Sequence, residues 1–231
     1  MMEFYIDGMA FTAVAGADSF VLNRIGFNAP DRDYDSIAIP GRNGELTIDN
    51  GRWKNASGYY QCFIQNGYKD KISPVLDWLS TVGYHRLEDT IEPTVYRMAR
   101  YTGMDEKKVK DNNIARFDLK FDLAPQKWLK SGEETITLSA NGTLHNPTRH
   151  NAQPKITLSG NGTLTVNGNT VTIADNTGEI ILDSEICRAY SGTTAKDSSM
   201  TGAFPELLPG ENTVSFTGFS SIQIIPRWWT L

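Results

Sequence analysis

Six Asn-Gly dipeptides constrain the fold of this chain more than any other feature; they begin at Asn43, Asn50, Asn66, Asn141, Asn161 and Asn167. Both central residues of a type I′ turn have positive φ, which Asn and Gly tolerate better than other residues. Such turns join adjacent antiparallel strands. Their repetition predicts a chain built mainly from β-hairpins.

The segment "LTVNGNTVTI" is the clearest of these hairpins. A two-residue turn at 167–168 places Val166 opposite Asn169 and Leu164 opposite Val171. This register puts the apolar side chains on or next to one face, as a half-buried hairpin requires.

The segment "ARFDLKFDLA" alternates apolar and charged residues without interruption. Such alternation is typical of a strand with one buried and one wet face. The side chains expected inside are Phe117, Leu119, Phe121 and Leu123.

One segment, "KISPVLDWLSTVGY", has the pattern of a helix, which we expect near residues 73–82. Ser73 suits the N-cap, Pro74 the first helical position and Gly83 the C-terminal stop. Its apolar residues recur at helical spacing, which predicts a helix that packs on a sheet. The charged segment at 104–111, "MDEKKVKD", is expected to be a solvated loop.

Composition divides the chain in two. Residues 1–130 carry 17 basic and 18 acidic residues, whereas residues 131–231 carry 5 and 9. Gly, Ser, Thr and Asn make up 44 of the last 101 residues, with about eight short strand patterns between turns. We therefore predict an N-terminal β domain with one helix over 1–130 and a β-sandwich over 131–231.

No pattern of catalytic residues is found. His85, His145 and His150 stand in no recognisable catalytic order, and no GxSxG segment is present. The carboxylates of "DRDYD" at 31–35 alternate as at the start of a calcium loop, but the glycine and distant glutamate of that loop are missing. The sequence predicts no enzyme, no cofactor and no metal site.

The N-terminal segment favours a protein that is made in a cytoplasm and not exported by the general route. The net charge is −5, which gives no reason to hold nucleic acid tightly. The N-terminus lacks the order of a signal peptide, and no apolar run could span a membrane. Cys62 and Cys187 each stand in a strand-like run, so we expect two buried thiols, with a disulfide as the alternative.

The chain ends in "IIPRWWTL", with two adjacent tryptophans. Pro226 cannot donate to a strand ladder, which indicates a strand end or an edge. Adjacent strand residues face opposite ways, so one of Trp228 and Trp229 is expected in the core. The other either closes the same core or contacts a partner.

Several segments in this order resemble the distal tail protein (Dit) of long-tailed phages that infect Gram-positive bacteria. They are "AIPGRNGEL", the helix "VLDWLSTVGYHRLED", "TVYRMARY", "FDLKFDLAPQKWL", "LHNPTRHNAQPKITLSGNGTLTVNG", "FPELLPGENTVSF" and "IIPRWWTL". The likeness spans nearly the whole chain. It implies that the second domain is a galectin-like sandwich. This chain departs from some members in its length, which leaves no room for an inserted carbohydrate-binding module.

The resemblance also implies a function. Six copies of a Dit protein form a ring through their first domains, and this ring joins the tail tube to a tail-tip protein of the tail-associated lysin type. In many phages the second domain supports receptor-binding proteins during host attachment. The resemblance places the chain in the virion tail, which is assembled in the host cytoplasm. It also implies that DNA passes through the ring without specific binding and that the chain has no membrane partner.

Five residues are candidates for interaction: Arg42, Gly44, Arg227, Trp228 and Trp229. In "GRNG", Gly41 and Gly44 are expected to shape a tight turn. Arg42 is expected to contact a neighbouring subunit or its own turn, with a solvated arginine as the alternative.

Two other functions remain open at this point. A carbohydrate-binding module of the tail tip would present exposed tryptophan rings to a sugar. A cell-wall hydrolase would need a pair of acids in a cleft, and the separation of two carboxylates in space cannot be read from the sequence.

Overall fold

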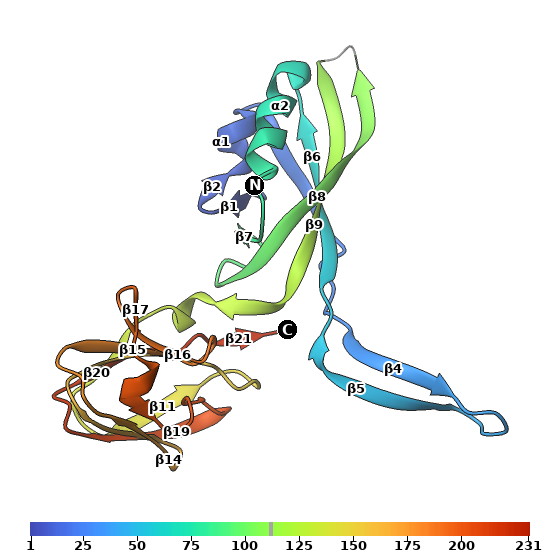
Figure 1. The fold of residues 1–231 in the computed structure, drawn as a ribbon. Helices are drawn as coiled ribbons and strands as arrows, with labels where there is room; N and C mark the ends of the chain where they lie inside the picture. The colour runs from blue at the N-terminus through green and yellow to red at the C-terminus, as the bar shows by residue number, and fades with distance from the viewer. Residues whose placement is uncertain (111–112) are drawn as a thin grey trace. The chain divides into compact units, whose positions relative to one another are not determined.

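The computed structural model describes residues 1–110 and 113–231, and the chain in it is mainly β (Figure 1). The backbone divides into two compact units. The first unit is Met1–Lys127 together with Leu231, and the second is Trp128–Thr230. The composition had suggested a boundary between residues 130 and 131.

One large sheet forms the framework of the first unit. Its strands pair in the order β2-β1-β7-β8-β9-β6-β3. Their bounds are β1 (Phe4–Ile6), β2 (Met9–Ala10), β3 (Ser19–Ile25), β6 (Ala56–Ile64), β7 (His85–Asp89), β8 (Val95–Lys110) and β9 (Ile114–Leu129). The remaining strands, β4 (Arg32–Ala38) and β5 (Glu45–Trp53), pair with each other in a separate two-stranded sheet.

Strand β9 confirms the alternation expected of "ARFDLKFDLA". Phe117, Leu119, Phe121 and Leu123 are all buried. The opposite face is not uniformly wet, because the carboxylate of Asp118 is buried and pairs with Lys107 at 3.3 Å. The alternating pattern alone predicts that Asp118 is exposed to solvent, whereas its ion pair with Lys107 shields it.

The loop expected at 104–111 is wrong for the residues that the structure describes. Strand β8 continues through it to Lys110, and Asp111 lies outside the described residues. The charged side chains in this segment form ion pairs on the surface of the strand. Asp105, for example, binds Lys120 at 2.6 Å. Long charged side chains on a strand can keep their ends in water, so high charge does not by itself exclude a strand.

The helix expected at 73–82 forms, but it begins and ends earlier, as α2 (Tyr68–Leu79). The side chain of Asn113 accepts from Gly67 N–H at 2.6 Å, and its backbone oxygen accepts from Tyr68 N–H at 3.0 Å. These contacts start the helix ahead of Ser73. Pro74 therefore lies inside the helix, because Asn113, which is far away in the sequence, fixes an earlier start than the capping pattern predicts.

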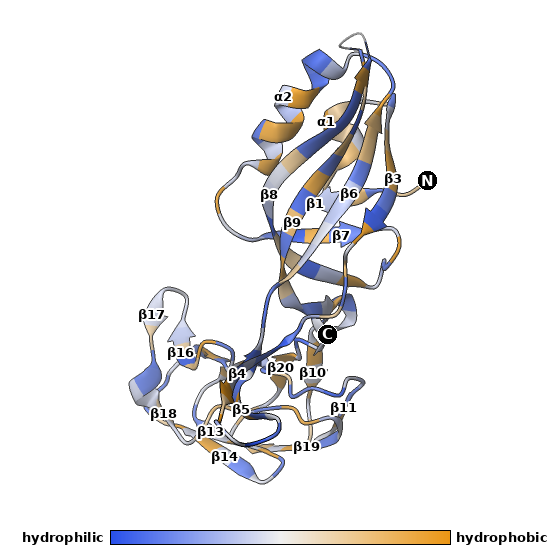
Figure 2. Cartoon of the chain, turned by 90° about the vertical axis from the view of Figure 1, so that its right-hand side faces the viewer, coloured by the Kyte–Doolittle hydropathy of each residue, from blue (hydrophilic) through white to orange (hydrophobic). Residues whose placement is uncertain are grey.

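The expectation of a single helix is also wrong, because a short helix, α1 (Phe11–Ala15), precedes β3. Five residues are too few for a periodic pattern, so the sequence carries little signal for it. Both helices contribute to one apolar core with the sheet, through Phe11 and Ala15 of α1 and Val75 and Leu79 of α2. Figure 2 shows hydrophobic and hydrophilic segments alternating along α2, as a helix with one buried face requires.

The β3 edge of the large sheet is irregular. Strand β3 pairs with β6 from Ser19 to Ile25, but the register shifts between Val21 and Asn23. The residue between them, Leu22, is the extra residue of a bulge and is 40% exposed. A bulge twists a strand and interrupts its ladder.

The second unit is a sandwich of two antiparallel sheets around one core, as predicted. The core takes residues from both sheets, among them Leu144, Ile156, Leu164, Ile180 and Ile222. One sheet has the order β10 (Ile136–Leu138), β20 (Ile222–Ile225), β12 (Lys155–Ser159), β15 (Glu179–Asp183), β16 (Arg188–Ser191), β17 (Thr194–Ala195). The other has the order β11 (Gly142–Asn146), β19 (Gly210–Thr217), β13 (Gly162–Val166), β14 (Asn169–Ile173), β18 (Met200–Thr201).

Smaller elements complete this unit. They are β21 (Trp229–Thr230) and the 3₁₀ turns η1 (Lys130–Gly132) and η2 (Asp197–Ser199). Strand β20 ends at Ile225, directly before Pro226, because proline cannot continue the ladder, so Pro226 marks a strand end as expected. The specific likeness to galectins stays a prediction.

The hairpin at Asn167 and Gly168 is confirmed in detail. Val166 pairs with Asn169 and Leu164 with Val171. Asn167 has φ +50° and Gly168 φ +86°, as a type I′ turn requires.

Substitution of Gly168 measures the free-energy penalty for a residue with a Cβ at the positive φ of this turn. A Cβ at Gly168 would meet no atom within 4 Å, so any penalty comes from the positive φ alone. We expect Gly168→Ala to lower the free energy of unfolding by about 1–2 kcal/mol. Gly178→Ala is the matched control, because that site is equally open and its φ is not positive. Equal stability of the two variants in urea denaturation would contradict this account.

The two thiols differ from expectation at one position. Cys62 is buried as predicted, and burial raises the pKa of its thiol. Cys187 is exposed, because the chain turns between β15 and β16 and Cys187 takes φ +51° there. Neither cysteine forms a disulfide. Among residues 1–110 and 113–231, no helix is long and apolar enough to cross a membrane.

Candidate assembly surfaces

The hairpin of β4 and β5, which we call the arm, exposes apolar side chains. Ile37 pairs with Leu46, and Asp35 pairs with Ile48. Paired residues share a face, and alternate residues of one strand do so too, so Ile37, Leu46 and Ile48 lie on one face of the arm. Each of these three is between 43% and 47% exposed.

Such a hairpin gains little stability from its own contacts, since two strands cannot cover either face. Its base is held by ion pairs instead. Arg32 binds Asp49 at 2.9 Å and packs over the Trp53 ring at 5.1 Å. Asp33 binds Arg52 at 2.7 Å. The base is thereby fixed, whereas the apolar face stays exposed.

The segment "DRDYD" begins just before the arm and runs into β4, and its carboxylates do not converge. Asp33 binds Arg52 and Lys54, while Asp35 accepts from the Asn50 amide at 3.2 Å. Across the described residues, no group of three His, Cys, Asp or Glu side chains could hold a metal ion.

The tip of the arm holds Arg42 and Gly44. Gly41 and Gly44 have φ +80° and +82°, and the Arg42 N–H donates to the Ile39 carbonyl at 3.1 Å, so the tight turn is confirmed. Within the described part of the chain, no side-chain hydrogen bond or ion pair involves Arg42. Its contact with a neighbouring subunit stays a prediction.

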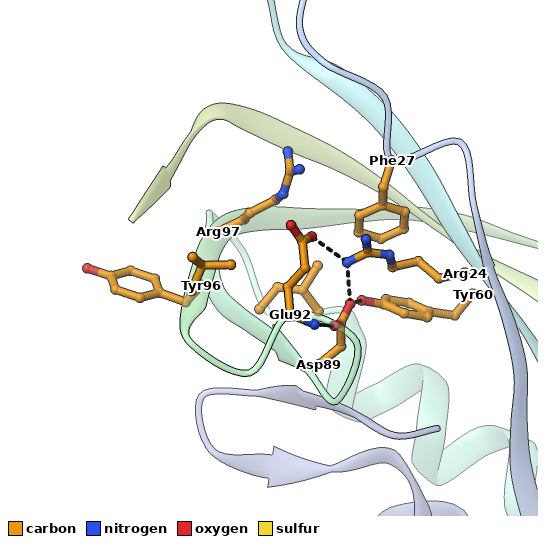
Figure 3. A pocket seen from close by; sticks show the side chains of 9 residues that line it. Arg24, Phe27, Tyr60, Asp89, Glu92, Tyr96 and Arg97 are labelled. Carbon is orange, nitrogen blue, oxygen red and sulfur yellow. Dashed lines mark hydrogen bonds and ion pairs between the residues drawn. The ribbon is translucent and has the colours of Figure 1, made fainter. Parts of the chain in front are cut away.

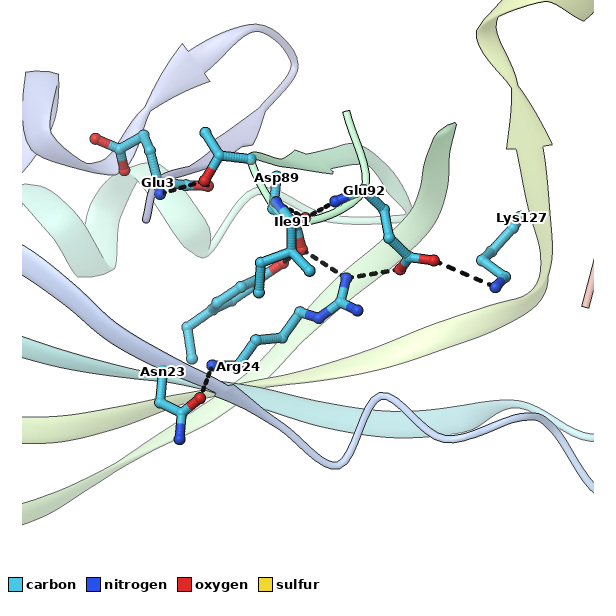
Figure 4. A network of polar contacts seen from close by, with 9 residues as sticks. Glu3, Asn23, Arg24, Asp89, Ile91, Glu92 and Lys127 are labelled. Atoms are coloured by element: carbon cyan, nitrogen blue, oxygen red, sulfur yellow. Dashed lines mark hydrogen bonds and ion pairs between the residues drawn. The ribbon is translucent and has the colours of Figure 1, made fainter. Parts of the chain in front are cut away.

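A cluster of charged side chains fills a pocket beside the large sheet (Figure 3). Arg24 of β3 donates to Asp89 at 2.9 Å and to Glu92 at 2.7 Å. The Tyr60 hydroxyl donates to Asp89 at 2.6 Å. Lys127 reaches Glu92 at 3.4 Å (Figure 4). Arg24 thus links β3 to the loop after β7.

These contacts set the protonation of the cluster. Burial raises the pKa of Asp89, but hydrogen bonds from Tyr60, from the Glu92 backbone and from Arg24 outweigh it, and the net pKa is lowered. Burial and the nearby Asp89 raise the pKa of Tyr60, so this hydroxyl remains a donor. The cluster is therefore a fixed set of ion pairs.

One member of the cluster is less well paired. Arg97 is buried at 6% exposure, and its Nη1 has no hydrogen-bond partner within the described residues. Burial lowers the pKa of Arg97, although Glu92 lies close enough to oppose this effect.

The terminal tryptophans separate as predicted. Trp228 is 4% exposed and belongs to the core of the second unit. Trp229 is half-buried, stacks on His150 with ring centroids 4.1 Å apart and donates from Nε1 to the Asn151 carbonyl at 2.9 Å. Before them, Arg227 binds Asp183 at 2.6 Å.

The histidines are spread over both units. His85 binds Asp7 at 2.7 Å, His145 binds Glu211 at 2.9 Å, and His150 packs on Trp229. The described residues thus bring no histidine into a catalytic arrangement with a nucleophile. The apolar face of the arm was not singled out from the sequence, although "SIAIP" and "ELTID" on either side of the turn alternate as the two strands of a hairpin would.

Comparison with known proteins agrees with the fold. No protein-family model matches the chain, and no curated protein is significantly similar to it. A solved structure does match: the crystal structure of the SPP1 Dit (gp 19.1) protein, described as a paradigm of the hub adsorption apparatus in phages that infect Gram-positive bacteria. The TM-score is 0.75 at 14% identity, and the match covers 100% of both chains. The chain therefore has the fold of this Dit protein over its entire length.

Proposed function

We propose that this chain is a structural protein of a phage tail, a distal tail hub. The observation that carries the proposal is the full-length match of its fold to the SPP1 Dit protein. In this role six copies form a ring that joins the tail tube to a tail-tip protein. The second unit supports receptor-binding proteins during host attachment, and DNA passes through the ring without specific binding. The role needs no catalysis and no cofactor, and it places the chain in the virion tail.

The arm supports the homo-oligomer within this proposal. Ile37, Leu46 and Ile48 form an apolar face that the arm cannot cover by itself. Large exposed apolar faces mark interaction sites in soluble proteins. A ring uses a head-to-tail contact, in which one part of each copy covers a different part of the next.

The carbohydrate-binding alternative is less well supported. A sugar stacks on a free aromatic face beside polar groups. One face of the Trp229 ring is occupied by His150, its Nε1 is bonded to Asn151, and Trp228 is buried. A glycan array remains the direct test of this alternative.

Electron microscopy of concentrated protein tests the ring. We expect class averages with six-fold symmetry and a central hole. Free subunits at low concentration are compatible with this result, because a head-to-tail contact gains its full stability when the ring closes. A closed dimer without a hole, persisting at high concentration, would contradict the proposal.

A pair of variants tests the role of the arm. Ile48→Asp places a charge on the apolar face, and we expect it to weaken association at least ~10-fold because a buried unpaired charge is costly. Thr47→Asp is the matched control, since Thr47 is the neighbouring exposed residue on the opposite face. Mass photometry measures both. Equal association of the two variants would show that this face does not take part.

A further inference from the structure

A basic groove lies in the first unit, away from the residues of the arm. It has a volume of about 460 Å³ and is lined by Phe63 of β6, Lys107, Lys108 and Lys110 of β8, and Ile114 and Arg116 of β9. The lining combines two apolar side chains with four cations. This is notable in a chain with a net charge of −5.

The positive charge of the groove is mostly uncompensated. Lys107 binds Asp118 at 3.3 Å. For Lys108, Lys110 and Arg116, no carboxylate of the described residues lies within ion-pair distance, and all three side chains are exposed. A surface of this kind fits an acidic partner that also has apolar side chains to cover Phe63 and Ile114.

The arm has the complementary chemistry. Its apolar face holds Ile37, Leu46 and Ile48, with Asp35 on the same face and Glu45 on the other. Neither Asp35 nor Glu45 forms an ion pair with another described residue, whereas Asp33 and Asp49 are neutralised by arginines at the base. The distal arm thus has one apolar face, two unpaired acids and one unpaired cation, Arg42, in its turn, and its exposure shows that it does not occupy the groove of its own chain.

We propose that the basic groove receives the arm of a second copy of this chain. The inference rests on the proposed hub function and names the receiving surface for the arm. Arm and groove are different surfaces of one chain, so their contact is head-to-tail and propagates from copy to copy until it closes. Apolar burial supplies affinity, and the pairing of Asp35 and Glu45 with the lysines supplies register.

Charge reversal tests the contact. The arm variant carries Asp35→Lys and Glu45→Lys, and the groove variant carries Lys108→Glu and Lys110→Glu. Each variant alone sets like charges against each other, and we expect its self-association to be about 100-fold weaker or more. The control, Arg149→Glu with Lys196→Glu, changes net charge as the groove variant does, at two sites of the second unit, and should associate like the wild type.

A mixture of the two variants gives the sharpest result. The lysines of the arm variant then meet the glutamates of the groove variant, while the unchanged arm of the latter meets an unchanged groove. We expect equal amounts to form rings with alternating subunits, which native mass spectrometry resolves. Circular dichroism confirms that each variant is folded before mixing.

The outcomes separate this inference from the proposed function. If the wild type forms rings and the groove variant does too, the groove assignment is wrong and the hub stands. If the wild type forms open chains that the groove variant abolishes and the mixture restores, the groove assignment stands and the ring fails. A wild type that stays monomeric when concentrated contradicts both. A fluorescent single-stranded oligonucleotide that binds the wild type but not the groove variant, with association unchanged, would assign the groove to nucleic acid instead.

Discussion

Trp228→Ala is expected to lower the free energy of unfolding of the second unit by about 3–5 kcal/mol. The Trp228 side chain is 4% exposed within an apolar core, and its removal leaves a cavity that the sheets cannot close. Its backbone is held as well, because the Trp228 carbonyl accepts from Leu129 N–H at 2.9 Å. Differential scanning calorimetry of the full chain measures the effect.

The neighbouring tryptophan provides the control. Trp229→Ala removes a ring stacked on His150 and one hydrogen bond from a half-buried site. We expect a loss of about 1–2 kcal/mol. Equal losses for the two variants would show that Trp228 is not the residue that closes the core.

Arg24→Met is expected to destabilise the first unit by about 3 kcal/mol at neutral pH. The change keeps the length and apolar stem of the side chain but removes the cation that binds Asp89 and Glu92. Asp89 is then a buried carboxylate without an ion-pair partner. The control is Arg100→Met, since Arg100 forms an exposed pair with Asp122 at 3.0 Å and should contribute at most about 1 kcal/mol.

The pH dependence of this loss has a defined sign. In the folded wild type the pKa of Asp89 is lowered, so its contribution is present above the ordinary aspartate pKa and is lost as pH falls through the folded pKa. Without Arg24, protonation of Asp89 removes less stabilising free energy from the folded state. The difference between wild type and Arg24→Met should therefore shrink from pH 7 toward about pH 3. A constant difference would contradict an electrostatic role for Arg24.

Much of the β framework could be predicted from local patterns. The Asn167 turn and the alternation of β9 are decided by residues adjacent in sequence, and both were confirmed. The ends of α2 could not be predicted, because Asn113, far along the chain, binds the first turn. The same holds for Asp118, which is buried because Lys107 of another strand covers it.

The candidate surfaces were less predictable than the fold. The tip of the arm could be found from "GRNG", whose glycines impose a turn. The exposure of Ile37, Leu46 and Ile48 could not, because an alternating apolar strand normally packs against a sheet. The basic groove brings together β6, β8 and β9, and no local pattern shows that Phe63 lies among those lysines.

The bulge at Leu22 bears on how the chain avoids aggregation. A flat, open strand edge is a template on which any extended chain can add a further strand. In β3 the ladder is interrupted at Leu22, and Met2 forms an isolated bridge to Val21. The bulge twists the strand and Met2 covers part of it, so this edge is a poor template for amyloid-like growth.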